Sequence, residues 1–337
     1  MEPDTIRKPV EEVRMRIGYK LFAEGYGPRE IVEQAVRAER AGFDFVEISD
    51  HFHPWLFSHG HSGFVWSMLA AIAERTGRIE IATGVTCPFL RVHPAIVAQA
   101  AATTAILSEG RFTLGVGAGE RLNEHVVGRG WPDVAVRHDM LVEAVEIMRL
   151  LWSGGYHSYR GEHLVLEDAR VFDLPELPPR VVVAAGGSRA AGLAAEHGDG
   201  LFATEPDSAL TDTYRERGGN GPCYGEVPLA WAADDRTALE SARELFRFGL
   251  TGWKVQAELP NPVNFEAATA LVRTEDMAEG FGYGPDPERH IDMARQFVDA
   301  GFDHLALINA GPDPEGFFRF FETELAEPIR NLSRPKG

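Results

Sequence analysis

The chain has 337 residues, of which 44% are hydrophobic and 25% are charged, the composition of a globular protein with a sizeable core. Asp and Glu outnumber Lys and Arg by 51 to 33, and a net charge of −18 argues against nucleic acid and anionic lipid as partners. No apolar run reaches the roughly 18 residues that span a bilayer, and residues 1–16 lack an apolar signal region. We therefore expect a cytoplasmic protein with no membrane partner.

Strand-like apolar runs alternate with amphipathic stretches along most of the chain. The first strand is predicted at 15–22, and Pro28 opens a helix at 28–41. The next predicted elements continue this alternation: a strand from 43 to Asp50, a helix at 62–78, a strand at 79–88, a helix at 94–111, a strand from 112, and the longest helix at 137–155.

Two segments interrupt the alternation. Residues 156–179 alternate polar and apolar side chains and close on paired prolines, which predicts a hairpin or loop insertion at about 153–179. A second insertion, rich in Pro, Gly and acids, is predicted at 251–289. The remaining predicted elements are strands at 181–188, 200–206 and 226–233, helices at 188–198 and 235–249, a helix and strand within 290–311, and a last helix at 314–325.

Eight strand candidates separated by helices predict an α/β fold, a (β/α)₈ barrel formed by one domain over residues 1–337. An open doubly wound sheet is the alternative. In both folds, ligand chemistry gathers at the carboxyl ends of the strands. The residues that end each predicted strand are therefore the candidates for a functional site.

The second predicted strand ends in Asp50 and His51, and Trp55 follows four residues after the histidine. A neutral imidazole at a strand end is suited to general base catalysis. A purely structural histidine is the alternative reading, but its position at the strand end and the nearby indole favour catalysis.

The fourth predicted strand leads through three glycines to Glu120. The run GVGAGE at 115–120 resembles a dinucleotide loop, but it has an acid where the last glycine of GxGxxG belongs. A carboxylate there would repel a pyrophosphate, so a partner for a ring nitrogen is the better role for Glu120. A helix N-cap is the alternative.

The fifth predicted strand closes with Ala184, Ala185, Gly186 and Gly187 just before a helix. Backbone N–H groups at such a helix start favour a phosphate or another anion, although a tight turn has the same sequence. His51, His53, His59 and His61 raise the possibility of a metal-dependent hydrolase. Because the fifth and sixth strand ends supply no histidine, we expect no metal.

The motifs SDHFHPW, ERTGRIEIATGV, HPAIVAQA, GVGAGERLNEH and AAGG resemble those of the luciferase-like barrel superfamily. Within it, the chain is similar to the deazaflavin-dependent glucose-6-phosphate dehydrogenases, which use coenzyme F420. The resemblance implies a (β/α)₈ barrel of the bacterial luciferase type, hydride transfer to the deazaflavin C5, a small-molecule substrate and a homodimer. An FMN-dependent monooxygenase of the same superfamily, with FMN as the cofactor, is the nearest alternative.

The resemblance also implies roles for individual residues. His51 would be the base that takes the substrate hydroxyl proton, Trp55 would pack at the reacting centre, and Glu120 would donate a proton to the ring N1. Gly84 and Val85 fall where the family has a non-proline cis peptide behind the ring. The remaining implied cofactor contacts are Asp50, Ala118, Gly119, Asn123, Ala185, Gly186 and Gly187.

The chain departs from the sugar-phosphate enzymes where these are expected to hold a phosphate. Across 203–210 and 256–284 the only basic residue is Arg273, among several acids. A phosphate dianion there would lack charge-assisted hydrogen bonds, so we expect a neutral alcohol or hemiacetal, or its carbonyl counterpart. A sugar-phosphate dehydrogenase and a non-enzymatic deazaflavin carrier remain alternatives, and the carrier is disfavoured because it needs neither His51 nor Glu120.

Overall fold

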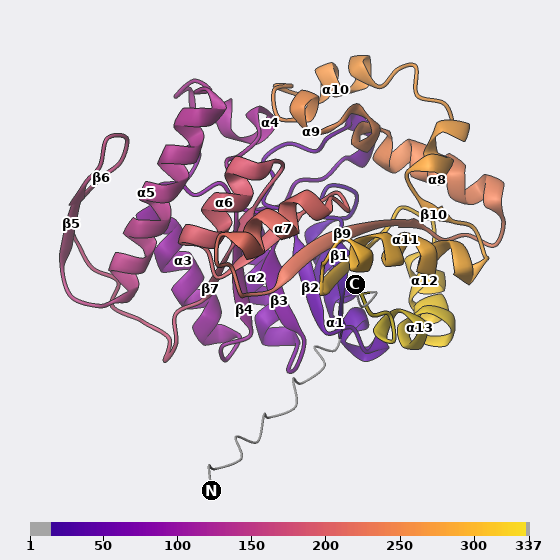
Figure 1. The fold of residues 1–337 in the computed structure, drawn as a ribbon, viewed down its shortest axis with the longest axis horizontal. Coiled ribbons are helices and arrows are strands. Elements are labelled where there is room, and N and C mark those ends of the chain that lie inside the picture. The colour runs from indigo at the N-terminus through magenta and orange to yellow at the C-terminus, as the bar shows by residue number, and fades with distance from the viewer. Residues whose placement is uncertain (1–14, 335–337) are drawn as a thin grey trace, which may run out of the picture.

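The computed structural model describes residues 15–334, and its centre is a closed barrel of parallel strands (Figure 1). Around the barrel the strands are β1 (Arg16–Leu21), β2 (Phe45–Ile48), β3 (Glu80–Thr83), β4 (Phe112–Val116), β7 (Arg180–Ala184), β8 (Gly200–Ala203), β9 (Cys223–Ala230) and β11 (His304–Asn309). Pairing of β8 with β9 closes the ring. The predicted (β/α)₈ barrel is confirmed, and the open sheet is excluded. Residues 1–14, part of the segment that lacks a signal pattern, lie outside the described residues.

Helices surround the barrel and bury one face each against it (Figure 1). They are α1 (Pro28–Ala41), α2 (Val65–Arg75), α3 (Pro94–Leu107), α5 (Val134–Trp152), α6 (Ser188–His197), α7 (Ser208–Glu216), α8 (Asp235–Phe246), α11 (Pro287–Asp299), α12 (Pro314–Phe320), η5 (Phe321–Leu325) and α13 (Ala326–Arg330). Local sequence explains the ends of α1, because Pro28 occupies its first turn and Gly42 terminates it at a φ of 87°.

One helix was not predicted, and several element boundaries differ from those predicted. Helix α7 was not predicted, because its apolar side chains are few and its Asp207 cap was not recognised. The strand predicted at 226–233 begins earlier, at Cys223. The helix predicted at 235–249 ends as an α-helix at Phe246 and continues as the 3₁₀ turn η3 (Arg247–Thr251).

The connections outside the barrel carry additional elements. Between α5 and β7, β5 (His157–Arg160) and β6 (Val165–Ala169) form an antiparallel hairpin that extends past α5 at the edge of the molecule (Figure 1). After η3 come α9 (Trp253–Gln256), α10 (Pro262–Ala268), η4 (Glu275–Glu279) and β10 (Gly282–Tyr283), which pairs with β9. Short turns η1 (Phe57–His59), α4 (Arg121–Glu124) and η2 (His125–Val127) follow β2 and β4.

Within residues 15–334, no helix combines the length and apolarity needed to cross a membrane.

Candidate active site

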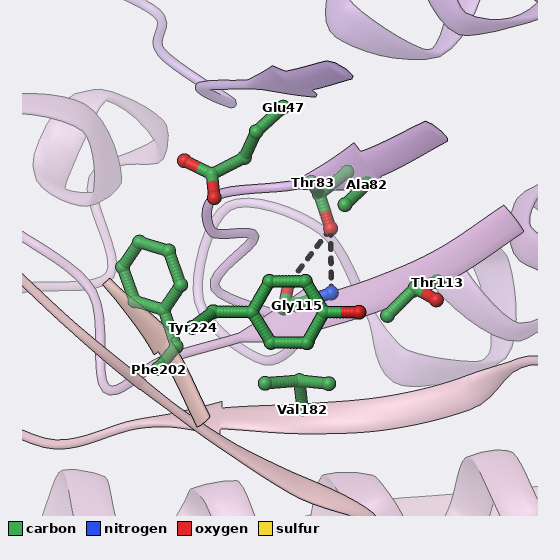
Figure 2. A pocket seen from close by; sticks show the side chains of 8 residues that line it. All are labelled: Glu47, Ala82, Thr83, Thr113, Gly115, Val182, Phe202 and Tyr224. Carbon is green, nitrogen blue, oxygen red and sulfur yellow. Dashed lines mark hydrogen bonds between the residues drawn. The ribbon is translucent and has the colours of Figure 1, made fainter. Parts of the chain in front are cut away.

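The interior of the barrel is packed with side chains and leaves no room for a cofactor. Figure 2 shows a cavity lined by Glu47, Ala82, Thr83, Thr113, Gly115, Val182, Phe202 and Tyr224. The space open to the centre of a water molecule is about 10 Å³, enough for roughly one water. Thr83 spans part of it by bonding both the N–H and the carbonyl of Gly115. A ligand must therefore bind above this layer, at the carboxyl ends of the strands.

A buried ion cluster lies between the cavity and the strand ends. Lys20 Nζ lies 2.8 Å from Glu47 Oε1, donates to the Gly84 carbonyl oxygen at 2.9 Å and contacts Glu226 Oε1. Burial opposes the charged ammonium, but Glu226 and Glu47 hold the pKa of Lys20 above its ordinary value. Burial also raises the pKa of Glu47 to about 8. A single cation thus faces two carboxyl groups directly beneath the candidate site.

Three ionisable side chains meet at the strand ends. His51, after β2, places Nδ1 3.1 Å from Oε1 of Glu24, which follows β1. The His51 Nε2 lies 3.5 Å from Oε2 of Glu120, which follows β4. The side chains of Glu24, His51 and Glu120 are 1%, 9% and 16% exposed. The two predicted catalytic groups therefore come together, and an unpredicted acid joins them.

Burial drives the pKa values of these groups apart. Burial, reinforced by the positive charge of Lys20, lowers the pKa of His51 to about 3. Burial, reinforced by the carboxyl group of Glu24, raises the pKa of Glu120 to about 8. At neutral pH the imidazole is thus a neutral base, while the Glu120 carboxyl keeps its proton. Opposed shifts of this kind are common where a base and an acid share one active site.

The imidazole also has a defined orientation. Neither Glu24 carboxylate oxygen nor His51 Nδ1 has a well-aligned hydrogen bond to another described residue, although the Nδ1 and Oε1 atoms are within reach of one. With its proton on Nδ1, toward Glu24, the neutral ring presents Nε2 as the proton acceptor on the side of Glu120.

Trp55 packs against His51 and forms one wall of an aromatic group. Its ring centroid lies 4.8 Å from that of His51 in an edge arrangement. Phe248, from η3, stacks on Trp55 at 4.6 Å and 11°, and Phe265, from α10, meets it edge-on at 5.0 Å. The wall beside the imidazole is therefore apolar and is completed by side chains from the segment after α8.

Both carboxylate oxygens of Asp50 accept hydrogen bonds from other side chains of the protein. Its Oδ1 accepts from Arg91 Nη2 at 2.7 Å, and its Oδ2 accepts from Thr86 Oγ1 at 3.0 Å. Arg91 also donates its backbone N–H to Glu124 Oε2 at 2.9 Å. The Asp50 side chain, 1% exposed, thus anchors the end of β2 to the loop after β3. An interaction with the cofactor, as the resemblance implies, remains a prediction.

Two glycine positions shape the edge of the site. The peptide bond between Gly84 and Val85 is cis, and a Cβ at Gly84 would lie 2.3 Å from Glu47 Oε1. The glycine is needed here because Glu47 is fixed by Lys20 and cannot move aside. Gly119, beside Ala118 in the loop before Glu120, has a φ of 79°, and a Cβ there would meet Cys87 Sγ at 2.8 Å. Both positions demand a residue without a side chain.

The loop after β7 approaches the segment that follows η3. The Ala185 N–H bonds the Phe202 carbonyl at 2.8 Å, and Gly187 precedes the first turn of α6. A Cβ on Gly186 would come within 2.9 Å of Trp253 Cδ1, whereas nothing lies within 4 Å of a Cβ on Gly187. The predicted anion-binding turn is therefore open at Gly187 and covered by the Trp253 indole at Gly186.

Glu120 directly precedes the short helix α4, and Asn123 lies within it. Glu120 occupies the N-cap position predicted as its alternative role, but its side chain makes no capping hydrogen bond and faces His51. Asn123 is buried, and its amide is bonded to Phe52, His53 and Glu120.

The four neighbouring histidines do not converge. His53 Nδ1 contacts the Leu122 carbonyl oxygen at 3.0 Å, and His59 Nε2 contacts the Leu245 carbonyl oxygen at 2.8 Å. Within residues 15–334, no three His, Cys, Asp or Glu side chains are grouped as a metal site would need.

Sequence reasoning missed Glu24, Arg91 and Glu124. Glu24 follows the apolar run of the first strand, as Asp50 and His51 follow the second, so the strand-end pattern could have identified it. Arg91 and Glu124 have no such signal, because their importance comes from contacts across 33 or more positions of sequence.

Comparison with known proteins identifies the family of the chain. The family model for luciferase-like monooxygenases matches residues 15–304. An F420-dependent glucose-6-phosphate dehydrogenase of Segniliparus rotundus is 37% identical over 333 residues, covering 94% of this chain and 99% of the relative. A second such enzyme, of Rhodococcus jostii, is 35% identical over 334 residues, covering 95% and 99%.

Solved structures resemble the chain in the same way. An F420-dependent secondary alcohol dehydrogenase, in complex with an F420–acetone adduct, is 30% identical with a TM-score of 0.87, covering 94% of this chain and 100% of its own. The coenzyme F420-dependent tetrahydromethanopterin reductase of Methanopyrus kandleri, 19% identical with a TM-score of 0.74 over 94% and 99%, shares the fold. The chain belongs to the luciferase-like monooxygenase family.

Proposed function

We propose that this protein is a coenzyme F420-dependent oxidoreductase that transfers hydride between a neutral alcohol or hemiacetal, or its carbonyl counterpart, and C5 of the deazaflavin. His51 acts as the base toward the substrate hydroxyl, and Glu120 acts as the acid on the opposite side. Trp55 packs beside the reacting centre. A cytoplasmic location and a homodimer belong to the same proposal.

The observation that carries the proposal is the buried pairing of His51 Nε2 with Glu120 Oε2 at 3.5 Å, where burial lowers the pKa of His51 and raises that of Glu120. Alcohol oxidation by hydride loss requires a base for the hydroxyl proton, and the neutral imidazole can take it. The protonated Glu120 side chain can supply a second proton to a ring nitrogen. Retention of both groups in one buried cluster argues against a carrier, which needs neither.

The residues at the strand ends fit a planar redox ring. When bound, the deazaflavin supplies a carbon that accepts or donates hydride. Glu24 and His51 Nδ1 are buried polar groups without well-aligned partners among the described residues, as expected where a polar ligand completes the site. A Cβ on Gly187 would meet nothing within 4 Å, and the N–H groups at the start of α6 suit an anionic cofactor tail.

The substrate side of the pocket favours an uncharged molecule. Trp55, Phe248 and Phe265 form an apolar wall next to His51. Arg273, the basic residue noted in the sequence, lies in solvent with its side chain 72% exposed and pairs with Asp276. Arg247, next to the wall, is already paired with Glu266 at 2.5 Å. Arg273 and Arg247 are therefore committed elsewhere, and neither offers a free guanidinium to a phosphate beside this wall.

A sugar-phosphate dehydrogenase is the second candidate, because the curated relatives carry that name. Reduction of F420 by the purified protein should be measured with 2-propanol, with larger secondary alcohols and with glucose 6-phosphate. We expect kcat/KM for the best alcohol to exceed that for glucose 6-phosphate by at least about 100-fold, equivalent to about 2.7 kcal/mol in transition-state binding. A preference for glucose 6-phosphate would contradict the substrate class and leave the cofactor assignment intact.

The cofactor is tested separately from the substrate. Titration of the protein with F420 and with FMN, followed by absorbance, reports the affinity for each. Tight binding of FMN and weak binding of F420 would favour the monooxygenase alternative.

A homodimer is supported by an apolar surface over α2 and α3. On helix α3, Ile96 and Ile106 are 56% and 42% exposed. Ile96, Trp66 and Leu107, with Gln99 and Thr103, border a groove between the two helices, a surface of the kind that pairs with a second copy. We expect the wild type to run as a dimer in light scattering after size-exclusion chromatography. Ile96→Asp should shift it toward monomer, whereas Val263→Asp, on exposed α10, should not.

A further inference from the structure

Asn123, in α4, is a side chain that joins the ends of β2 and β4. Its Oδ1 accepts hydrogen bonds from the backbone N–H groups of Phe52 at 2.9 Å and His53 at 3.1 Å, the two residues after His51. Its Nδ2 donates to Glu120 Oε2 at 3.2 Å. Asn123 is 3% exposed, so water competes little for these three bonds.

The partners fix the orientation of the amide. Two backbone N–H groups require an acceptor, so the amide oxygen faces Phe52 and His53 and the NH₂ group faces Glu120. The N–H donated to Oε2 fixes the Glu120 carboxyl group where the same oxygen lies 3.5 Å from His51 Nε2.

The surrounding contacts make α4 a rigid support for this arrangement. The Leu122 carbonyl is contacted by His53 Nδ1, and Glu124 is tied to Arg91, which in turn holds Asp50. These contacts fix the backbone on either side of His51. Within this network, Asn123 is the residue that also hydrogen-bonds to Glu120.

We propose that Asn123 is a positioning residue that holds the loop after His51 and the Glu120 carboxyl group in a fixed relation to each other; this inference rests on the function proposed above. The family resemblance implies instead that Asn123 contacts the cofactor. Both acceptor positions and one of the two donor hydrogens of its amide are already used within the protein, which favours positioning.

Two variants separate these roles. Asn123→Asp retains oxygens for the Phe52 and His53 N–H groups but replaces the donor facing Glu120 with an acceptor. Asn123→Ala removes all three bonds. Asn220→Asp is the matched control, because Asn220 is exposed in the loop before β9, at the opposite end of the barrel. For each protein we would measure the Kd for F420, kcat and KM for 2-propanol across pH, and the His51 imidazole NMR resonance without cofactor.

We expect Asn123→Asp to lower kcat about 10- to 100-fold with KM and the cofactor Kd within about twofold of wild type. The His51 resonance should move, and the basic limb of the rate profile should shift to higher pH, because a second carboxylate beside Glu120 opposes its ionisation. Asn123→Ala should lower kcat similarly if it folds, and Asn220→Asp should match wild type in every measurement.

Two results would overturn the proposal. One is a cofactor Kd raised about tenfold or more with kcat preserved, which would assign Asn123 to cofactor binding. The other is an Asn123→Asp protein that matches wild type in kcat, pH profile and His51 resonance. If wild type oxidises no alcohol, the proposed function fails, and the resonance of the cofactor-free variant still decides whether Asn123 positions His51.

Discussion

At the scale of single residues, the site depends on burial that acts oppositely on two kinds of group. Burial disfavours the charged form of both, so it lowers the pKa of His51 and raises that of Glu120. The same burial therefore favours a neutral imidazole and a protonated carboxyl group at one pH. Lys20 adds to this by placing a positive charge beneath the imidazole.

This separation predicts the effect of removing His51. His51→Ala should lower kcat for alcohol oxidation about 100- to 10,000-fold, because the base is lost, with little change in the Kd for F420. The wild-type rate should stay level from about pH 5 to about pH 7 and fall as Glu120 ionises near its pKa of about 8. His61→Ala, at an exposed histidine of the same loop, is the control. Unchanged turnover in His51→Ala would contradict the assignment.

At the scale of elements, the segment 247–260 covers the ends of β4 and β7. Arg121 donates its N–H to the Ala257 carbonyl at 3.0 Å, and Glu258 accepts from Trp131 Nε1 at 2.8 Å. Arg137, stacked on Trp131 at 3.8 Å, lies 3.6 Å from Glu258. Through its contacts with Trp131 and Arg137, Glu258 therefore links this covering segment to the loop before α5 and to the start of α5.

Loss of this fastening should open the segment. Glu258→Ala removes one hydrogen bond and a half-exposed ion pair, together about 1 kcal/mol, which corresponds to roughly a fivefold larger open population. We expect correspondingly faster trypsin cleavage after Lys254 and faster release of F420, with little change in melting temperature. Glu279→Ala, at an exposed acid of η4, should behave as wild type. Equal cleavage rates in the two variants would show that Glu258 does not hold the segment.

The sequence predicted the barrel elements well because their signals are local. Apolar runs closed by Gly42 or by Asp50 mark helix and strand ends without reference to distant residues. The insertion predicted at 251–289 was read as irregular, although Asn261 caps α10 through the Asn264 N–H and Pro262 begins it. The pairing of Asn123 with Phe52 and His53 joins residues about seventy positions apart, which no local pattern indicates.

At the scale of the whole molecule, the site lowers stability at the pH where it works. A carboxyl group whose folded pKa is raised is neutral in both states below its unfolded pKa of about 4.5. Above that pH the unfolded chain loses a proton that the folded protein keeps, so the free energy of unfolding falls until the pH passes the folded pKa. Glu120, Glu47 and Glu124, with pKa values raised by burial to about 8, 8 and 7, all act in this direction.

Glu120→Gln should therefore be inactive yet more stable than wild type at alkaline pH. Glutamine keeps the shape and an acceptor for Asn123 but never ionises. The pH-dependent loss of unfolding free energy that Glu120 causes should therefore disappear. A shift from 4.5 to about 8 corresponds to a few kcal/mol. Urea unfolding should give a smaller loss of free energy between about pH 5 and about pH 8.5 in Glu120→Gln than in wild type, with near-equal values at the lower pH. Glu279→Gln controls for loss of a surface charge. If the free energy of unfolding depends on pH in the same way in Glu120→Gln and wild type, Glu120 is ionised in the folded protein and cannot be the acid.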